Sequence, residues 1–135
     1  MPSATLTHRP PVQSVQREIE RVRAGLSFRA VENLQKALDL PVEKLAGMLG
    51  MSRATLHRRK LQGKIDQHES ERVARYERLL AKATEFFGDP ESARKWLSSP
   101  QRGLGGAVPI DFAASEIGAR EVENLLGRLE FGVYS

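Results

Sequence analysis

Apolar residues recur along most of the chain at spacings of three and four residues, the period of an amphipathic helix. No segment has the sustained alternation of apolar and polar residues that a half-buried strand shows. The pattern therefore predicts an all-α protein. The first stripe consists of Val12, Val15, Ile19, Val22 and Leu26. We expect this helix to dock on the main body rather than to form a coiled coil, because two heptads are few for that structure.

Residues that start and stop helices divide the rest of the chain. The further helices are predicted at about Ser27–Leu38, Val42–Leu49, Arg53–Lys60, Ser70–Phe87, Pro90–Leu97 and Pro109–Ser115, with a last helix from Gly118 to a stop at Gly132. Ser27, Ser52 and Asp89 are the expected N-caps. The inner faces are predicted to be Val31, Leu34, Ala37 and Leu38, then Val73, Tyr76, Leu80, Ala83 and Phe87, and finally Val122, Leu125, Leu126 and Leu129. Residues 1–11 are expected to be a flexible tail.

The segment Val42–Lys60 has the features of a helix-turn-helix. Ala46 is small enough for two helices to cross closely, and Gly50 tolerates the positive φ that a tight turn needs. Leu56 would turn back toward the first helix. The second helix would then enter the major groove of DNA, with Arg53, Thr55, His57 and Arg58 facing outward. Arginine there can bind guanine or phosphate, whereas Arg59, Lys60 and Lys64 are expected to meet phosphates. An ordinary helical corner with a solvated basic face is the alternative.

The charge distribution supports a nucleic-acid surface in the first half. The whole chain has 135 residues and a formal net charge of +4. Residues 1–65 carry 12 Lys/Arg against 5 Asp/Glu, a net of +7, and residues 66–135 carry 9 against 12, a net of −3. Such asymmetry favours DNA binding in the first half and a different task in the second.

The motif at Val42–Lys60 resembles the helix-turn-helix of Xre-type, phage-repressor-like regulators. One departure is Arg59, at a place where such motifs usually carry an apolar residue, and its aliphatic stem could cover the gap. The expected organisation is a tail and first helix over 1–25, an Xre-like DNA-binding domain over 26–68, and a helical dimerisation and partner-binding domain over 69–135.

The C-terminal half carries a second resemblance, over about fifty residues. Its residues are Phe86–Asp89, Ala93–Leu97, Pro100, Leu104–Gly106, Pro109–Phe112, Gly118–Val122, Leu125–Arg128 and Glu130–Tyr134. Together they resemble the toxin-binding domain of Xre/ParS/MbcA-type antitoxins. The resemblance implies an antitoxin of a type II toxin–antitoxin system, which neutralises a RES-domain toxin that degrades NAD. It also implies repression of its own operon through operator DNA.

The segment Arg128–Ser135 is the expected toxin-binding element. Its apolar residues would anchor in the toxin's active-site cleft, and its charged groups would pair with basic residues there. The proposed contacts are Arg128, Glu130, Phe131, Val133, Tyr134 and Ser135. Completion of the protein's own core is the alternative.

Two further features have two interpretations each. Trp96, the only tryptophan, is either a core residue or an interface anchor. The glycine-rich stretch Arg102–Gly106 invites comparison with a phosphate-binding loop, but it lacks the lysine and the serine or threonine of that motif. A tight loop is therefore the favoured interpretation.

Composition restricts the remaining functions. The chain has no cysteine and three scattered histidines, so we expect no metal site, no cofactor and no thiol catalysis. No serine lies in a nucleophile motif, and an enzyme is not expected. No apolar run approaches the ~20 residues of a membrane span, and the first residues lack the core of a signal peptide. The expected location is the bacterial cytoplasm, at the nucleoid when operator-bound.

A homodimer, or a higher complex with the toxin, is also expected. One recognition helix reads too few base pairs for useful specificity. The helix Ser70–Phe87 and the C-terminal domain are the candidate dimer surfaces. The alternative function is a stand-alone Xre-like regulator whose C-terminal domain only dimerises.

Overall fold

A computed structural model of the chain describes residues 11–130. Over this range the protein consists of helices and connecting loops without a strand, which confirms the all-α prediction. The elements are α2 (Val12–Ala24), α3 (Phe28–Leu38), α4 (Val42–Met48), α5 (Arg53–Gln62), α6 (Gln67–Phe87), α7 (Pro90–Leu97), a 3₁₀ turn η1 (Arg102–Leu104), α8 (Pro109–Phe112) and α9 (Glu116–Glu130). Residues 1–10 of the predicted tail lie outside the described residues.

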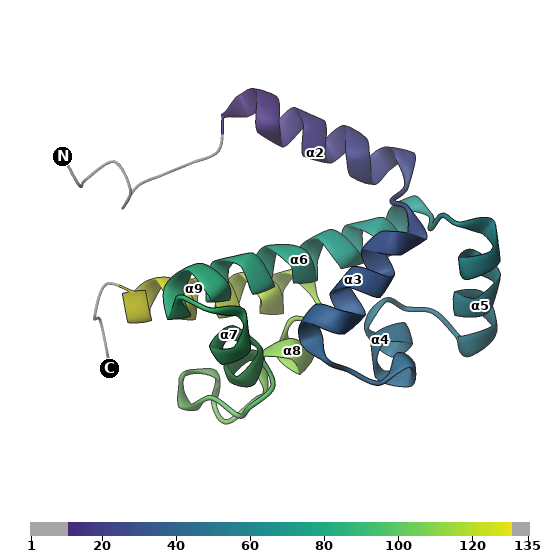
Figure 1. Cartoon of the computed structure of the whole chain (residues 1–135). Helices are drawn as coiled ribbons and strands as arrows, with labels where there is room; N and C mark the ends of the chain where they lie inside the picture. Colours follow the sequence, from purple (N-terminus) through teal and green to yellow (C-terminus); the bar gives the residue numbers. More distant parts are fainter. Residues whose placement is uncertain (1–10, 131–135) are drawn as a thin grey trace.

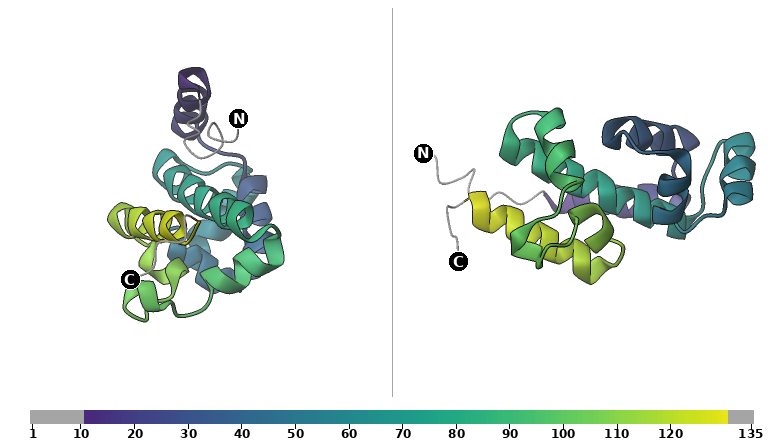
Figure 2. Two further views of the ribbon diagram at one scale, coloured as in Figure 1. Left: turned by 90° about the vertical axis from the view of Figure 1, so that its left-hand side faces the viewer. Right: turned by 90° about the horizontal axis from the view of Figure 1, so that it is seen from below.

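The long helix α6 is the axis of the molecule (Figure 1). It packs against α7 and α9 of the C-terminal half and against α2 and α3 of the N-terminal half. In Figures 1 and 2, α2 lies on the opposite side of α6 from α7 and α8. One helix therefore connects the two halves of the chain.

The start of α6 differs from the sequence prediction. We predicted a start near Ser70, but the helix begins at Gln67. Asp66 accepts a hydrogen bond from the backbone N–H of Glu69, and the Glu69 carboxylate accepts one from the backbone N–H of Asp66. This reciprocal capping box satisfies two amides that the first turn would leave unpaired. It places the helix start three residues earlier.

A single apolar core runs through both halves. Most predicted inner residues are buried, including Val31, Tyr76 and Leu126. Ala37, predicted as buried, is exposed, and Leu80, Phe87 and Leu129 are only partly buried. Leu79, which the sequence analysis did not select, is buried instead, because α6 has helices on more than one side and its inner face is correspondingly wide.

Caps and close contacts shape the C-terminal half. Asp89 caps α7 as predicted, accepting a bond from the backbone N–H of Ser92, and Pro90 occupies the first turn. The bond from Ser92 lowers the pKa of the Asp89 carboxyl. A Cβ atom at Gly118 would lie 1.7 Å from the carbonyl oxygen of Phe112, so only glycine permits α9 to start this close to α8.

Candidate DNA-binding and partner-binding surfaces

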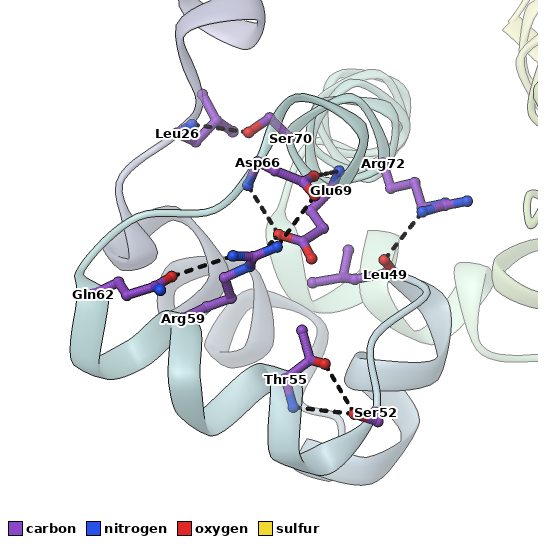
Figure 3. Close-up of polar contacts among 10 residues, drawn as sticks. All are labelled: Leu26, Leu49, Ser52, Thr55, Arg59, Gln62, Asp66, Glu69, Ser70 and Arg72. Carbon is purple, nitrogen blue, oxygen red and sulfur yellow. Dashed lines mark hydrogen bonds and ion pairs between the residues drawn. The ribbon is translucent and has the colours of Figure 1, made fainter.

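The turn between α4 and α5 has the helix-turn-helix geometry that the sequence predicts. Ala46 is buried, and Gly50 has a φ of +72°. The Ser52 side chain caps α5 by accepting a bond from the backbone N–H of Thr55 at 3.1 Å. Arg72 of α6 reaches across the turn and donates to the carbonyl oxygen of Leu49 (Figure 3). The turn is thus stabilised by contacts with both α5 and α6.

The structure separates the seven predicted DNA-binding residues into two groups. The side chains that stay exposed are Arg53, His57, Arg58, Lys60 and Lys64. Arg53 lies 3.3 Å from Glu43, but both side chains are largely exposed, so this ion pair contributes little and DNA can displace it. Over residues 11–130, no carboxylate pairs with the other four. A basic, solvated surface results.

Thr55 and Arg59 form the second group, because both are engaged within the protein. The Thr55 hydroxyl accepts a hydrogen bond from Ser52 at 3.0 Å. The Arg59 side chain is only 20% exposed. Its Nε donates to Oε1 of Glu69 at 2.9 Å, and its Nη2 lies 3.2 Å from Oδ2 of Asp66. The structure therefore directs this guanidinium toward the start of α6 rather than to the outer face of α5.

Arg59, Asp66 and Glu69 form a polar cluster that joins α5 to α6 (Figure 3). Glu69 is buried, and a buried carboxylate requires both a charge partner and hydrogen bonds. The hydrogen bond from Arg59 to Glu69 raises the pKa of the guanidinium. Gln62 adds a further contact, accepting from Nη1 of Arg59 at 3.2 Å. The capping box of α6 thus also anchors the recognition helix.

Sequence reasoning missed an apolar component of the outer face of α5. Leu61 is 76% exposed, and Ala54 is also exposed. Residues 54, 57, 58 and 61 have the helical spacing of a single face, opposite Leu56 and Arg59. The signal in the sequence was the helical spacing of Leu61 from His57 and Arg58, which places this leucine on the predicted basic face.

Two features of the C-terminal half are an aromatic contact at Trp96 and a glycine-rich loop that forms hydrogen bonds within itself. Trp96 is partly buried, and its ring centroid lies 5.9 Å from that of Phe87. In the glycine-rich loop, Gln101 donates its backbone N–H to Ala107 and accepts one from Gly106. Gly105 and Gly106 have positive φ angles. These features agree with a tight loop and with a packing role for Trp96.

Helix α9 carries the described part of the predicted toxin-binding element. Arg128 is partly buried and Glu130 is exposed at its end. Phe131, Val133, Tyr134 and Ser135 lie outside the described residues. Two exposed apolar side chains in this half were not predicted: Phe112 of α8 and Ile117 of α9, the latter 78% exposed.

Neither a metal-binding cluster nor a membrane-spanning helix occurs among residues 11–130. Among residues 11–130, no three histidine or acidic side chains gather closely enough to bind a metal ion. None of the helices over that range is both long and apolar enough to span a membrane.

The fold and this surface define a helix-turn-helix protein with an appended helical domain. The family model described as the antitoxin Xre-like helix-turn-helix domain matches residues 17–78. A second model, the antitoxin Xre/MbcA/ParS C-terminal toxin-binding domain, matches residues 82–132. The junction between the two lies within α6.

Three similar proteins carry the family name that these models give. An antitoxin Xre of Yersinia enterocolitica is 34% identical over 119 residues, covering 87% of this chain and 80% of that protein. An antitoxin Xre of Photorhabdus laumondii is 42% identical over 74 residues, covering 54% and 50%. One from Pseudomonas putida is 31% identical over 64 residues, covering 47% and 40%. The chain belongs to the Xre antitoxin family, and its two halves are a helix-turn-helix domain and a toxin-binding domain.

Proposed function

We propose that this antitoxin neutralises a RES-domain toxin that degrades NAD and represses its own operon, acting in the cytoplasm. The supporting observation is the match of residues 82–132 to a toxin-binding domain, joined through α6 to a helix-turn-helix. Neither activity requires a cofactor or a catalytic group of its own. A stand-alone regulator would use this half for dimerisation alone, and the match to a toxin-binding domain favours the antitoxin.

The proposed mechanism is occlusion of the toxin's active site by residues 128–135. Arg128 and Glu130 lie in the last turn of α9. The inner face of this helix is buried through Val122, Leu125 and Leu126. Phe131, Val133 and Tyr134 follow in sequence and supply apolar contacts of about 1–3 kcal/mol each when buried against the toxin. Glu130 pairs with basic side chains that would otherwise receive NAD phosphates.

Deletion of Glu130–Ser135 tests this mechanism. We expect the shortened chain to keep its helical circular dichroism and its operator affinity but to lose rescue of cells from NAD depletion. A matched full-length variant, Phe131→Ala/Val133→Ala/Tyr134→Ala, removes the anchors and keeps the length. Full protection by a folded, shortened chain would move the inhibitory contact elsewhere, with Phe112 and Ile117 as the next candidates. Co-purification with the product of a neighbouring toxin gene separates the antitoxin from a stand-alone regulator.

Operator binding is proposed to use the exposed face of α5. Arg53 and Arg58 contact base edges or phosphates, His57 lies between them, and Lys60 and Lys64 contact phosphates. Leu61 adds an apolar surface suited to a thymine methyl group. Thr55 and Arg59 support DNA binding indirectly, because they hold α5 in place. Thr55 bonds Ser52 at the N-cap of α5, and Arg59 bonds Glu69 of α6.

A dimer is part of this proposal. A single short recognition helix reads few base pairs, whereas two related by a two-fold axis read two half-sites. The half-sites would then lie about 10 base pairs apart, or a multiple of that distance.

A further inference from the structure

The helix α2 is amphipathic, yet none of its residues is buried. Its apolar stripe remains open, with Val12 69% exposed, Val15 43% and Ile19 48%. Near its C-terminal end α2 approaches α6, where Arg21 lies 2.9 Å from Glu77. Toward its N-terminal end it diverges from α6 (Figure 1). We predicted that this helix would dock on the main body, and it does so mainly near one end.

A groove of about 940 Å³ separates the two helices. One wall is the apolar stripe of α2, and the other consists of Ala74 and charged residues of α6, including Glu71, Arg75 and Arg78. Three large aliphatic side chains in water along a 13-residue helix are uncommon for a monomer surface and typical of an interaction site.

The spacing of the stripe is symmetric. Val12, Val15, Ile19 and Val22 are separated by three, four and three residues, with the midpoint at position 17. An antiparallel copy of the helix therefore places Val12 opposite Val22 and Val15 opposite Ile19, so that every apolar position meets another. A stripe with this symmetry is complementary to itself, as a two-fold interface requires.

Charge favours the antiparallel orientation. The last turn of α2 carries Arg21 and Arg23, and its first turn carries no acidic residue. A parallel pair would bring four arginines together at one end. An antiparallel pair separates them and opposes the two helix dipoles.

The groove adds a second contact to the pair of helices. A 13-residue helix is about 20 Å long. The α2 of a second copy would meet the stripe of α2 and also the wall of α6, and the two-fold axis repeats the contact with α6. The interface therefore extends beyond the two stripes alone.

We propose that this chain dimerises through α2, with the α2 of a second copy lying antiparallel along the stripe and in the groove against α6. The inference deepens the dimer of the proposed function: it keeps one surface that the sequence suggested, the helix at 70–87, and adds α2, which the sequence did not suggest. It also places the dimer contact on the opposite side of α6 from α7 and α8 (Figure 2), leaving that side of the toxin-binding half free.

The first experiment measures the mass of the full chain by light scattering at micromolar concentration. We expect the parent to be a dimer and Val15→Glu/Ile19→Glu to be a monomer with unchanged helical content. The control Gln13→Glu/Ala24→Glu adds the same charge to the opposite, exposed face of α2 and should remain a dimer. A monomeric parent overturns both the dimer and this surface. A dimeric parent together with a dimeric Val15→Glu/Ile19→Glu variant overturns only the surface.

A second experiment does not depend on the stability of those variants. The parent has no cysteine, so introduced thiols report distance directly. An equimolar mixture of Val12→Cys and Val22→Cys chains should form a cross-linked dimer under mild oxidation, because disulfides require Cα atoms within about 7 Å. Each variant alone should cross-link poorly. Efficient cross-linking of either alone, or none in the mixture, overturns the antiparallel register.

Discussion

Helices α5 and α9 are the last helices of their respective halves, and they are held in place by different forces. In α9, the buried residues are Gly118, Ala119, Val122, Leu125 and Leu126. In α5 only Leu56 is buried, and the Arg59 cluster supplies the second anchor. A helix that presents a wide basic face has few positions left for apolar packing. Buried ionic contacts take over part of that task.

Ion pairs also join α9 to α6 at the edge of their apolar interface. Arg75 bonds Glu116 at 3.1 Å, and Arg78 bonds Glu123 at 2.7 Å. These carboxylates are more exposed than Glu69, so the pairs supplement an apolar interface rather than replace one. Helix α9 should therefore respond mainly to lost volume, and α5 mainly to lost charge.

The largest expected effect is on the free energy of unfolding, through the apolar packing of α9. Leu126→Ala should lower the free energy of unfolding by about 2–5 kcal/mol, because Leu126 is buried in the core. Leu61→Ala on the exposed face of α5 is the control and should change it by less than about 0.5 kcal/mol. Urea denaturation followed by circular dichroism measures both. Equal stability of the two variants would contradict the difference between the helices.

The next largest effect is expected on operator affinity, when arginines on the exposed face of α5 are replaced. Arg53→Ala or Arg58→Ala should weaken operator binding by about 1–3 kcal/mol where the arginine contacts a base. Arg120→Ala, an exposed arginine of α9, is the matched control and should not change it. Lys60→Ala and Lys64→Ala should instead weaken binding to all sequences and reduce the salt slope by about one each. Normal binding by the Arg53/Arg58 double variant would show that another surface contacts DNA.

The smallest expected effect concerns the polar anchor itself. Glu69→Gln keeps an acceptor for the capping box but removes the charge that Arg59 faces. We expect a few-fold loss of operator affinity, a smaller fall in the urea midpoint than Leu126→Ala causes, and unchanged neutralisation of the toxin. Glu85→Gln removes a different, exposed carboxylate of α6 and serves as the control. Equal operator affinities for parent and Glu69→Gln would leave Arg59 without a positioning role.

The helices and their caps were readable from the sequence because their causes are local. Ser27, Ser52 and Asp89 each precede a helix and accept a bond from its first turn. The spacing of Ala46, Gly50 and Leu56 predicted the helix-turn-helix correctly. The start of α6 is also a local feature: its apolar stripe begins only at Val73, but the capping-box spacing of Asp66 and Glu69 marks the start at Gln67.

The candidate site was only partly readable. Exposure of Arg53 and Arg58 follows from helical periodicity, which the sequence contains. The retention of Arg59 by Glu69 does not, because it depends on how α5 and α6 meet across the turn at Gly63. The contact between Lys44 of α4 and Asp111 of α8, at 2.5 Å, joins residues 67 positions apart and had no signal in the pattern.

By itself, the sequence determined which residues form helices, which face of each is apolar, and where basic charge accumulates. These properties depend on a few neighbouring residues. The tertiary structure alone decided what each face meets. The stripe of α9 is buried against α6, whereas the equally regular stripe of α2 stays open. Periodicity specifies that a helix has an apolar face, but the occupant of that face is set by the packing of segments distant in the chain.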